Sequence, residues 1–118
     1  MPYALLIVEP IGQRAARSEA EGRQAYASMV DFAQTLKAQG KLLAVESLQS
    51  EGKATRVSVR GGRAQALDGP YAEAKEMVGG FYLLDVATRD EAVAIARQCP
   101  AVDFATVEVR ECAPCHVL

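Results

Sequence analysis

Two apolar runs limit what this chain can fold into more than any other feature. Residues 3–8 are apolar without a break, and so are residues 81–84 inside a longer predicted strand, 78–86. Both runs are short enough to be strands, and neither alternates with polar side chains. A strand that is apolar on both sides has to be covered on both faces of its sheet. We therefore expect a sheet with helices on one face and a second cover on the other.

An amphipathic helix is predicted for about residues 19–39. Ser18 and Glu21 have the spacing of a capping box, and apolar residues recur behind them every three or four positions. Gly40 stands where a left-handed helix stop is expected. A second helix is expected to begin at Thr88 or Asp90 and to end before Pro100.

The other segments are predicted to be strands. The first strand covers residues 2–8 and ends at Glu9-Pro10, and residues 11–18 are expected to be irregular. Residues 42–48 and 105–111 are further strands, and Gly61-Gly62 closes a hairpin. The order is then that of an α+β, ferredoxin-like fold, βαββαβ with an inserted β-hairpin. It forms one domain, residues 1–111, followed by an irregular tail, residues 112–118.

The second face of this sheet still needs a cover. Both helices of a ferredoxin-like fold lie on the same face, so the apolar side chains on the opposite face have no partner within the chain. The simplest solution is a second copy. We therefore expect a homodimer in which two sheets face each other.

Composition excludes some classes of partner. The 118 residues carry a formal net charge of -2, and the basic residues are scattered, so nucleic acid is not an expected partner. The apolar stretch near the start is too short to span a bilayer, and no membrane association is expected. Three cysteines are an odd number and are interpreted as reduced thiols. These features favour a cytoplasmic location.

A resemblance to a known family rests on four stretches. They are Asp68-Gly69-Pro70-Tyr71-Ala72-Glu73-Ala74-Lys75-Glu76, residues 79–86, Cys99-Pro100 and residues 106–110. Together they resemble the DGPF-type branch of the YCII-related family, over about residues 3–111. The resemblance implies a ferredoxin-like dimeric alpha+beta barrel. It also implies a suspected enzymatic role through a His and Asp pair, and, for some DGPF-type members, association with sigma factors.

Asp68 matches the family aspartate and is the candidate catalytic residue. It is either a general acid or base, or a turn residue that accepts hydrogen bonds from the backbone. The family histidine has no counterpart, because His116 lies in the tail. Tyr71 stands where the motif usually has Phe and adds a hydroxyl group.

Five further residues are candidate ligand-binding residues. Glu46 in an apolar strand and Arg56 in the hairpin are predicted either to pair with each other or to hold a ligand. Tyr71 is a candidate for the wall of an apolar pocket. Lys75 and Glu76 belong to a predicted charged helical turn, which is either the mouth of a cleft or solvated surface.

The tail sequence Cys112-Ala113-Pro114-Cys115-His116 matches the c-type haem attachment pattern. Its place at the end of the chain, with no haem-binding fold after it, argues against haem. A dithiol role and metal capture remain alternatives, and a loose reduced tail is favoured. No cofactor and no resident metal are predicted.

The leading functional hypothesis is a cytoplasmic homodimer with a small-molecule cleft near Asp68, Tyr71, Glu46 and Arg56, with an organic acid or a ring compound as its ligand. Such a cleft is compatible with catalysis. The rival hypothesis is an interaction module without chemistry that binds a sigma factor.

Overall fold

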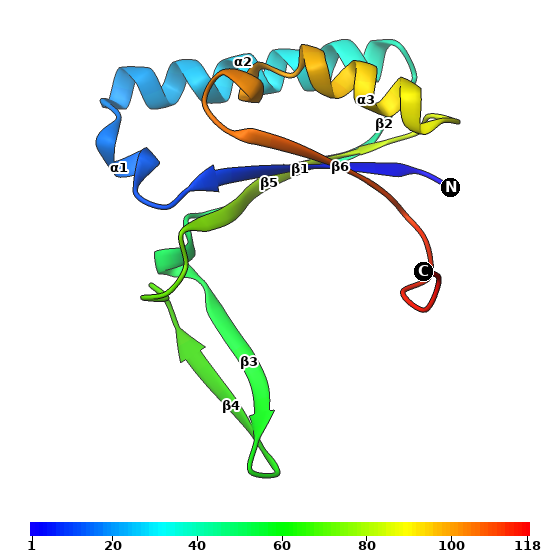
Figure 1. Ribbon diagram of the computed structural model, residues 1–118. Coiled ribbons are helices and arrows are strands. Elements are labelled where there is room, and N and C mark those ends of the chain that lie inside the picture. The colour runs from blue at the N-terminus through cyan, green and yellow to red at the C-terminus, as the bar shows by residue number, and fades with distance from the viewer.

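The computed structural model describes residues 1–118 as one antiparallel sheet, a separate hairpin and a layer of helices (Figure 1). The sheet has the strand order β2-β5-β1-β6, and β3 pairs with β4 in the hairpin. The strands are β1 Tyr3–Pro10, β2 Leu42–Ser47, β3 Thr55–Arg60, β4 Arg63–Asp68, β5 Glu76–Leu84 and β6 Thr106–Glu111. The helices are α1 Gln13–Ala16, α2 Glu19–Ala38 and α3 Arg89–Gln98, with short 3₁₀ turns η1 Glu51–Lys53 and η2 Pro100–Asp103.

This order confirms the predicted α+β fold of ferredoxin-like type with an inserted hairpin. Figure 1 shows α2 and α3 on the same face of the sheet, as that topology requires. The hairpin leaves the sheet on the other side. None of the helices combines the length and the apolar character that a membrane crossing requires.

The predicted helix ends are confirmed. Ser18 and Glu21 form a capping box, in which the Glu21 N–H donates to Ser18 Oγ at 3.1 Å and the Ser18 N–H donates to Glu21 Oε1 at 2.9 Å. That second hydrogen bond stabilises the carboxylate and holds the pKa of Glu21 below its usual value. Thr88 caps α3, and Gly40 has a φ of 71°, the left-handed value that ends α2.

The core fills the space between the helices and the sheet. Side chains of β1 alternate between this core and the opposite face, so that Tyr3, Leu5 and Ile7 are buried. Tyr82 of β5 pairs with Leu5 and is 2 % exposed. Its hydroxyl donates to the carbonyl of Met29 in α2 at 2.8 Å, which fixes the helix against the sheet.

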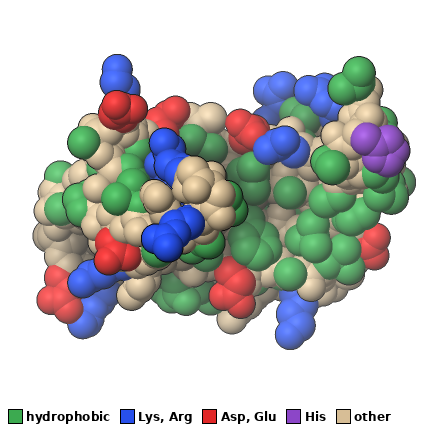
Figure 2. All heavy atoms as spheres, turned by 90° about the horizontal axis from the view of Figure 1, so that it is seen from below, with side chains coloured by type: hydrophobic (Ala, Val, Ile, Leu, Met, Phe, Trp, Pro, Cys, Tyr) green, Lys and Arg blue, Asp and Glu red, His purple; other side chains and the backbone are tan.

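The face of the sheet away from the helices is uncovered. The alternation places Ala4, Leu6 and Val8 of β1 on it, together with Phe81 and Leu83 of β5, and all five are half-buried. We call these five residues the bare sheet face. Figure 2 shows hydrophobic side chains gathered on this side, between the lobe that holds the hairpin and the tail marked by the single histidine.

Three sequence expectations are wrong in detail. The chain makes no helical turn at residues 73–76, because Glu76 already pairs with Pro10 as the first residue of β5. Strand β1 runs through Pro10 instead of ending at Val8. Pro10 pairs with Glu76, and the next residue, Ile11, donates its N–H to the carbonyl of Lys75 at 2.9 Å, so the pairing with β5 continues past the proline. The stretch predicted to be irregular, residues 11–18, contains the helix α1.

The core packing predicts a large cost for Leu5→Ala. Leu5 is 0 % exposed, so truncation removes buried apolar surface and leaves a cavity, with an expected loss of about 2–5 kcal/mol in the free energy of unfolding. Val117→Ala in the tail, where the side chain is 57 % exposed, is the control and should change stability by less than about 0.5 kcal/mol. Urea unfolding followed by circular dichroism measures both, and equal losses would contradict this description of the core.

Candidate functional site

A cleft opens between α2 and the β2 edge of the sheet, and we call it the α2 cleft. Its volume is about 530 Å³, within the range of about 300–1,000 Å³ that small-molecule sites occupy. It exists because α3 covers the β1 and β6 side of the sheet, whereas nothing packs beside α2 above β2. Its lining includes Ile7, Arg17, Gly22, Ala25, Tyr26, Met29, Val30, Lys37, Val45 and Tyr82.

One stripe of α2 forms the roof of this cleft. Residues 22, 25, 26, 29, 30, 33, 34 and 37 follow each other at alternating steps of three and one, and all of them line it. Gly22 and Ala25 are small and leave space near the start of the helix. At 1.5 Å per residue, the stripe from Gly22 to Lys37 is about 22 Å long. The cleft is therefore elongated and follows the helix axis.

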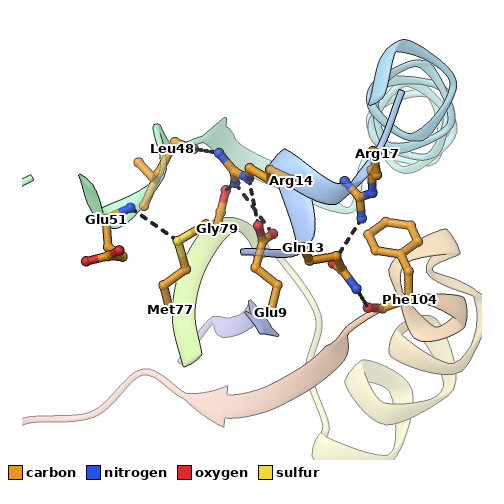
Figure 3. Close-up of polar contacts among 9 residues, drawn as sticks. All are labelled: Glu9, Gln13, Arg14, Arg17, Leu48, Glu51, Met77, Gly79 and Phe104. Carbon is orange, nitrogen blue, oxygen red and sulfur yellow. Dashed lines mark hydrogen bonds and ion pairs between the residues drawn. The ribbon is translucent and has the colours of Figure 1, made fainter. Parts of the chain in front are cut away.

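The start of the cleft is closed by an ion pair between Glu9 of β1 and Arg14 of α1 (Figure 3). Arg14 Nε lies 2.6 Å from Glu9 Oε1, and Arg14 Nη2 lies 3.5 Å from Glu9 Oε2. The Glu9 side chain is only 5 % exposed and that of Arg14 is 32 % exposed. Arg14 also donates to the carbonyls of Leu48 at 2.6 Å and Gly79 at 3.1 Å. One guanidinium thus joins β1, α1, β5 and the segment after β2.

Glycines on β5 make room for this ion pair. A Cβ atom on Gly79 would overlap the Glu9 carboxylate and lie 2.7 Å from Arg14 Nη2. The pairing of β1 with β5 shifts register next to Gly79, which is typical of a bulge. A Cβ atom on Gly80 would lie 2.8 Å from the carbonyl oxygen of Glu46 in the adjacent strand. The Gly79-Gly80 pair therefore allows the backbone and the ion pair to approach β5 closely.

Two further cations line the cleft without an acidic partner. Arg17 lies near the start of α2, where it donates to Gln13 Oε1 at 3.0 Å and stacks over the Phe104 ring at 4.7 Å. Lys37 lies near the other end of the helix and is exposed. Neither of the two forms an ion pair. Arg14 neutralises Glu9, and Glu46 is the one other acidic residue in the lining, so together with Arg17 and Lys37 the lining carries a net charge of +1.

Burial disfavours loss of the proton from two side chains, Tyr82 in the cleft lining and Cys99 behind it. Burial raises the pKa of the Tyr82 hydroxyl well above its usual value, and this hydroxyl is already bonded to Met29. Burial also raises the pKa of the Cys99 thiol, which opposes formation of the nucleophilic thiolate. Tyr82 and Cys99 therefore support the walls of the α2 cleft. The geometry of the α2 cleft is suited to binding and orienting a molecule.

The six predicted site residues do not come together. Glu46 is part of the α2 cleft lining at its β2 edge, although its pairing with Phe81 directs its side chain to the side of the bare sheet face. Arg56, Asp68 and Tyr71 lie instead at the base of the hairpin, where the Arg56 guanidinium stacks over the Tyr71 ring at 3.8 Å and Asp68 Oδ1 accepts from Thr55 Oγ1 at 2.8 Å. The predicted ion pair between Glu46 and Arg56 is not formed. The ligand-binding and catalytic roles of these residues stay predictions.

The remaining predicted positions are exposed, apart from Cys112. Lys75 and Glu76 lie at the start of β5 and face solvent. Cys112 is half-buried, and Cys115 and His116 are exposed in a turn of the tail. No three side chains of His, Cys, Asp or Glu lie close enough to hold a metal ion. The structure does not bring Cys112, Cys115 and His116 together as one set of ligands.

Sequence reasoning missed Glu9 and Arg14, although a signal for Glu9 was present. Tyr3, Leu5, Ile7 and Glu9 alternate along one strand, so Glu9 had to lie on the same inward face as three core residues. A carboxylate in that position needs a buried partner. Arg14 gave no such signal, because it follows a proline and a glycine in a stretch without periodicity.

Gly79→Ala tests this end of the cleft. The added methyl group can be accommodated only if Glu9 moves and weakens its pairing with Arg14, so we expect a loss of about 2–3 kcal/mol in the free energy of unfolding. Gly22→Ala is the matched control. Its new Cβ atom meets nothing within 4 Å, and alanine inside a helix should stabilise by about 0.5–1 kcal/mol. Thermal and urea unfolding measure both, and a neutral Gly79→Ala variant would refute the close approach described here.

Comparison with known proteins identifies the family. Residues 1–115 match the YCII-related domain. An uncharacterized protein of Rhizobium meliloti (strain 1021) is 33% identical over 97 residues, which cover 82% of this chain and 78% of that protein. The match spans all six strands and all three helices described above. The chain therefore belongs to the YCII-related family.

Proposed function

We propose that this protein binds a small, elongated, mainly apolar molecule with an acidic group, an organic acid, in the α2 cleft. The observation that carries the proposal is a cleft of about 530 Å³ whose apolar lining contains two cations, Arg17 and Lys37, without acidic partners. A carboxylate is the natural partner of an arginine or lysine at the edge of an apolar site. A ring fits beside Tyr26 and Met29, which supply apolar surface.

The same proposal includes a catalytic role, as a step that follows binding of the ligand. The candidate general acid or base is Asp68, the residue that matches the family aspartate. In one chain it lies at the hairpin base and outside the α2 cleft lining. A reaction that used Asp68 on a ligand in this cleft would need the two regions to meet, and a second chain is the simplest means of bringing them together. Turnover by this chain is proposed only through such a dimer.

We propose a homodimer through the bare sheet face and a place in the DGPF-type branch of the family. The dimer is supported by the five apolar residues of that face, which no element of the chain covers. The branch is supported by the sequence Asp68-Gly69-Pro70-Tyr71. A cytoplasmic location is proposed as well, since all three cysteines are free thiols.

A second candidate function is binding of a sigma factor without chemistry. It is favoured by the same uncovered apolar surface, which would suit a protein partner as well as a second copy. Co-purification tests it: a stable complex with a sigma factor, combined with no retained metabolite, would support the interaction module. Loss of that complex on Leu6→Asp would place it on the bare sheet face.

Binding of carboxylic acids tests the first candidate. Linear and aromatic acids of six to twelve carbons are compared with the matching amides by calorimetry. We expect the acids to bind more tightly, and we expect Arg17→Ala combined with Lys37→Ala to weaken acid binding by about tenfold or more while amide binding stays unchanged. The control is Arg23→Ala, on the same helix, whose guanidinium pairs with Glu19 outside the cleft.

Equal affinity for acids and amides in the wild-type protein would contradict the role of the two cations. Val30→Trp, which adds bulk to the cleft lining, should abolish binding of both series if the α2 cleft is the site. Binding that survives Val30→Trp in a folded protein would place the ligand elsewhere.

A further inference from the structure

The β3–β4 hairpin is the least covered element of the molecule. Every residue of both strands is exposed, and its two strands form a sheet of their own that pairs with no other strand. The hairpin also makes the chain extended: the radius of gyration is 16.1 Å, against about 13.5 Å expected for a compact domain of this length. An isolated two-stranded hairpin is at best marginally stable in water. It therefore needs something to pack against.

One face of this hairpin is apolar. The register pairs Val57 with Ala66 and Val59 with Ala64, so these four side chains share one face. Val57 is 71% exposed and Val59 is 69% exposed. The other face carries the polar and basic residues Arg56, Ser58, Arg60, Arg63 and Gln65, with Leu67 beside Arg56. Separating apolar from polar side chains on two faces stabilises a hairpin only if its apolar face is covered.

The base of the hairpin is firmly attached, so the hairpin has a defined direction. Tyr71 is buried, its hydroxyl donates to the Leu67 carbonyl at 3.1 Å, and the Arg56 guanidinium covers its ring. The Tyr71 N–H donates to the Glu51 carboxylate at 2.9 Å, and the Glu51 N–H donates to Met77 Sδ of β5 at 3.2 Å (Figure 3). These contacts join the hairpin to the sheet through η1 and the start of β5.

We propose that the β3–β4 hairpin is an arm that packs its apolar face onto a second copy of this chain. This inference rests on the homodimer proposed above and extends it. Figure 1 shows that the hairpin extends away from the helices, on the side of the bare sheet face. A second copy seated on that face comes to lie alongside the hairpin. In a two-fold dimer each chain then contributes one arm to the other.

The distribution of charge favours a second copy of this chain as the molecule that packs against the hairpin. Of the 13 basic and 15 acidic side chains, the hairpin holds three arginines and one acid, Asp68, which leaves the rest of the chain with an excess of four acidic groups. A positive arm and a negative body attract each other between copies. Two acidic residues, Glu46 and Glu108, pair across the strands with Phe81 and Leu6 and so flank the bare sheet face.

The test compares substitutions on the two faces of the hairpin. Val57→Asn with Val59→Asn changes the apolar face, and Ser58→Asn with Gln65→Asn changes the opposite face of the same strands. We expect the first pair to raise the dimer dissociation constant, measured by sedimentation, by about tenfold or more and the second pair to leave it within about twofold. Circular dichroism should show the main sheet and helices unchanged in both, because the hairpin is outside the main core.

Hydrogen exchange gives an independent readout. Amides of residues 55–68 should gain protection as protein concentration rises through the dissociation constant, and the gain should vanish in the Val57→Asn, Val59→Asn variant. A monomeric wild-type protein at micromolar concentration would overturn both the dimer and the arm. A dimer whose dissociation constant and hairpin exchange are unaffected by the Val57→Asn, Val59→Asn change would overturn the arm alone.

Discussion

The buried ion pair between Glu9 and Arg14 is the interaction on which the site depends. It is formed at the point where β1 leaves the sheet, and the same guanidinium binds carbonyls on β5 and on the segment after β2. A charge removed from water is stable only if its partner and hydrogen bonds are in place, so the four segments must keep their relative positions. This requirement fixes the closed end of the α2 cleft. It also explains the glycine at position 79, where any side chain would collide with the pair.

The open sides of the molecule have a common origin. A four-stranded sheet with two helices on one face leaves its other face uncovered. Here α3 also packs away from β2, so the helix-covered face is open along its β2 edge. Only 17 of the 118 residues are buried, and the uncovered surfaces remain apolar. The α2 cleft is small and cationic, as an organic acid requires. The bare sheet face and the hairpin are broad and apolar, as a protein partner requires.

Local signals in the sequence predicted the fold well. The capping box at Ser18, the glycine stop at Gly40 and the Gly61-Gly62 turn act through contacts within a few residues, and all three form as expected. Strand limits were less certain because they depend on the partner strand: β1 continues through Pro10 since Lys75 accepts a hydrogen bond from the next residue. The same long-range pairing converted the expected helical turn at residues 73–76 into the start of β5.

The site was harder to predict because its parts are distant in sequence. Family resemblance drew attention to Asp68 and Tyr71, which the structure places at the base of the hairpin. The cleft is assembled from α1, α2, β1, β2 and β5, and only Glu46 among the predicted residues lines it. Spacing along the chain reveals which face of an element a residue occupies. It does not reveal that Arg14 reaches Glu9 and the carbonyl of Gly79.

A double-mutant cycle on Glu9 and Arg14 is the most direct measurement of this account. Unfolding free energies are determined in urea for the wild-type protein, Glu9→Gln, Arg14→Met and the double variant. We expect each single change to destabilise the protein, with a coupling energy of about 1.5–3 kcal/mol, below the largest values for buried pairs because Arg14 is partly exposed. A coupling energy below about 0.5 kcal/mol would mean that the two side chains act independently, and it would contradict the central place given to this ion pair.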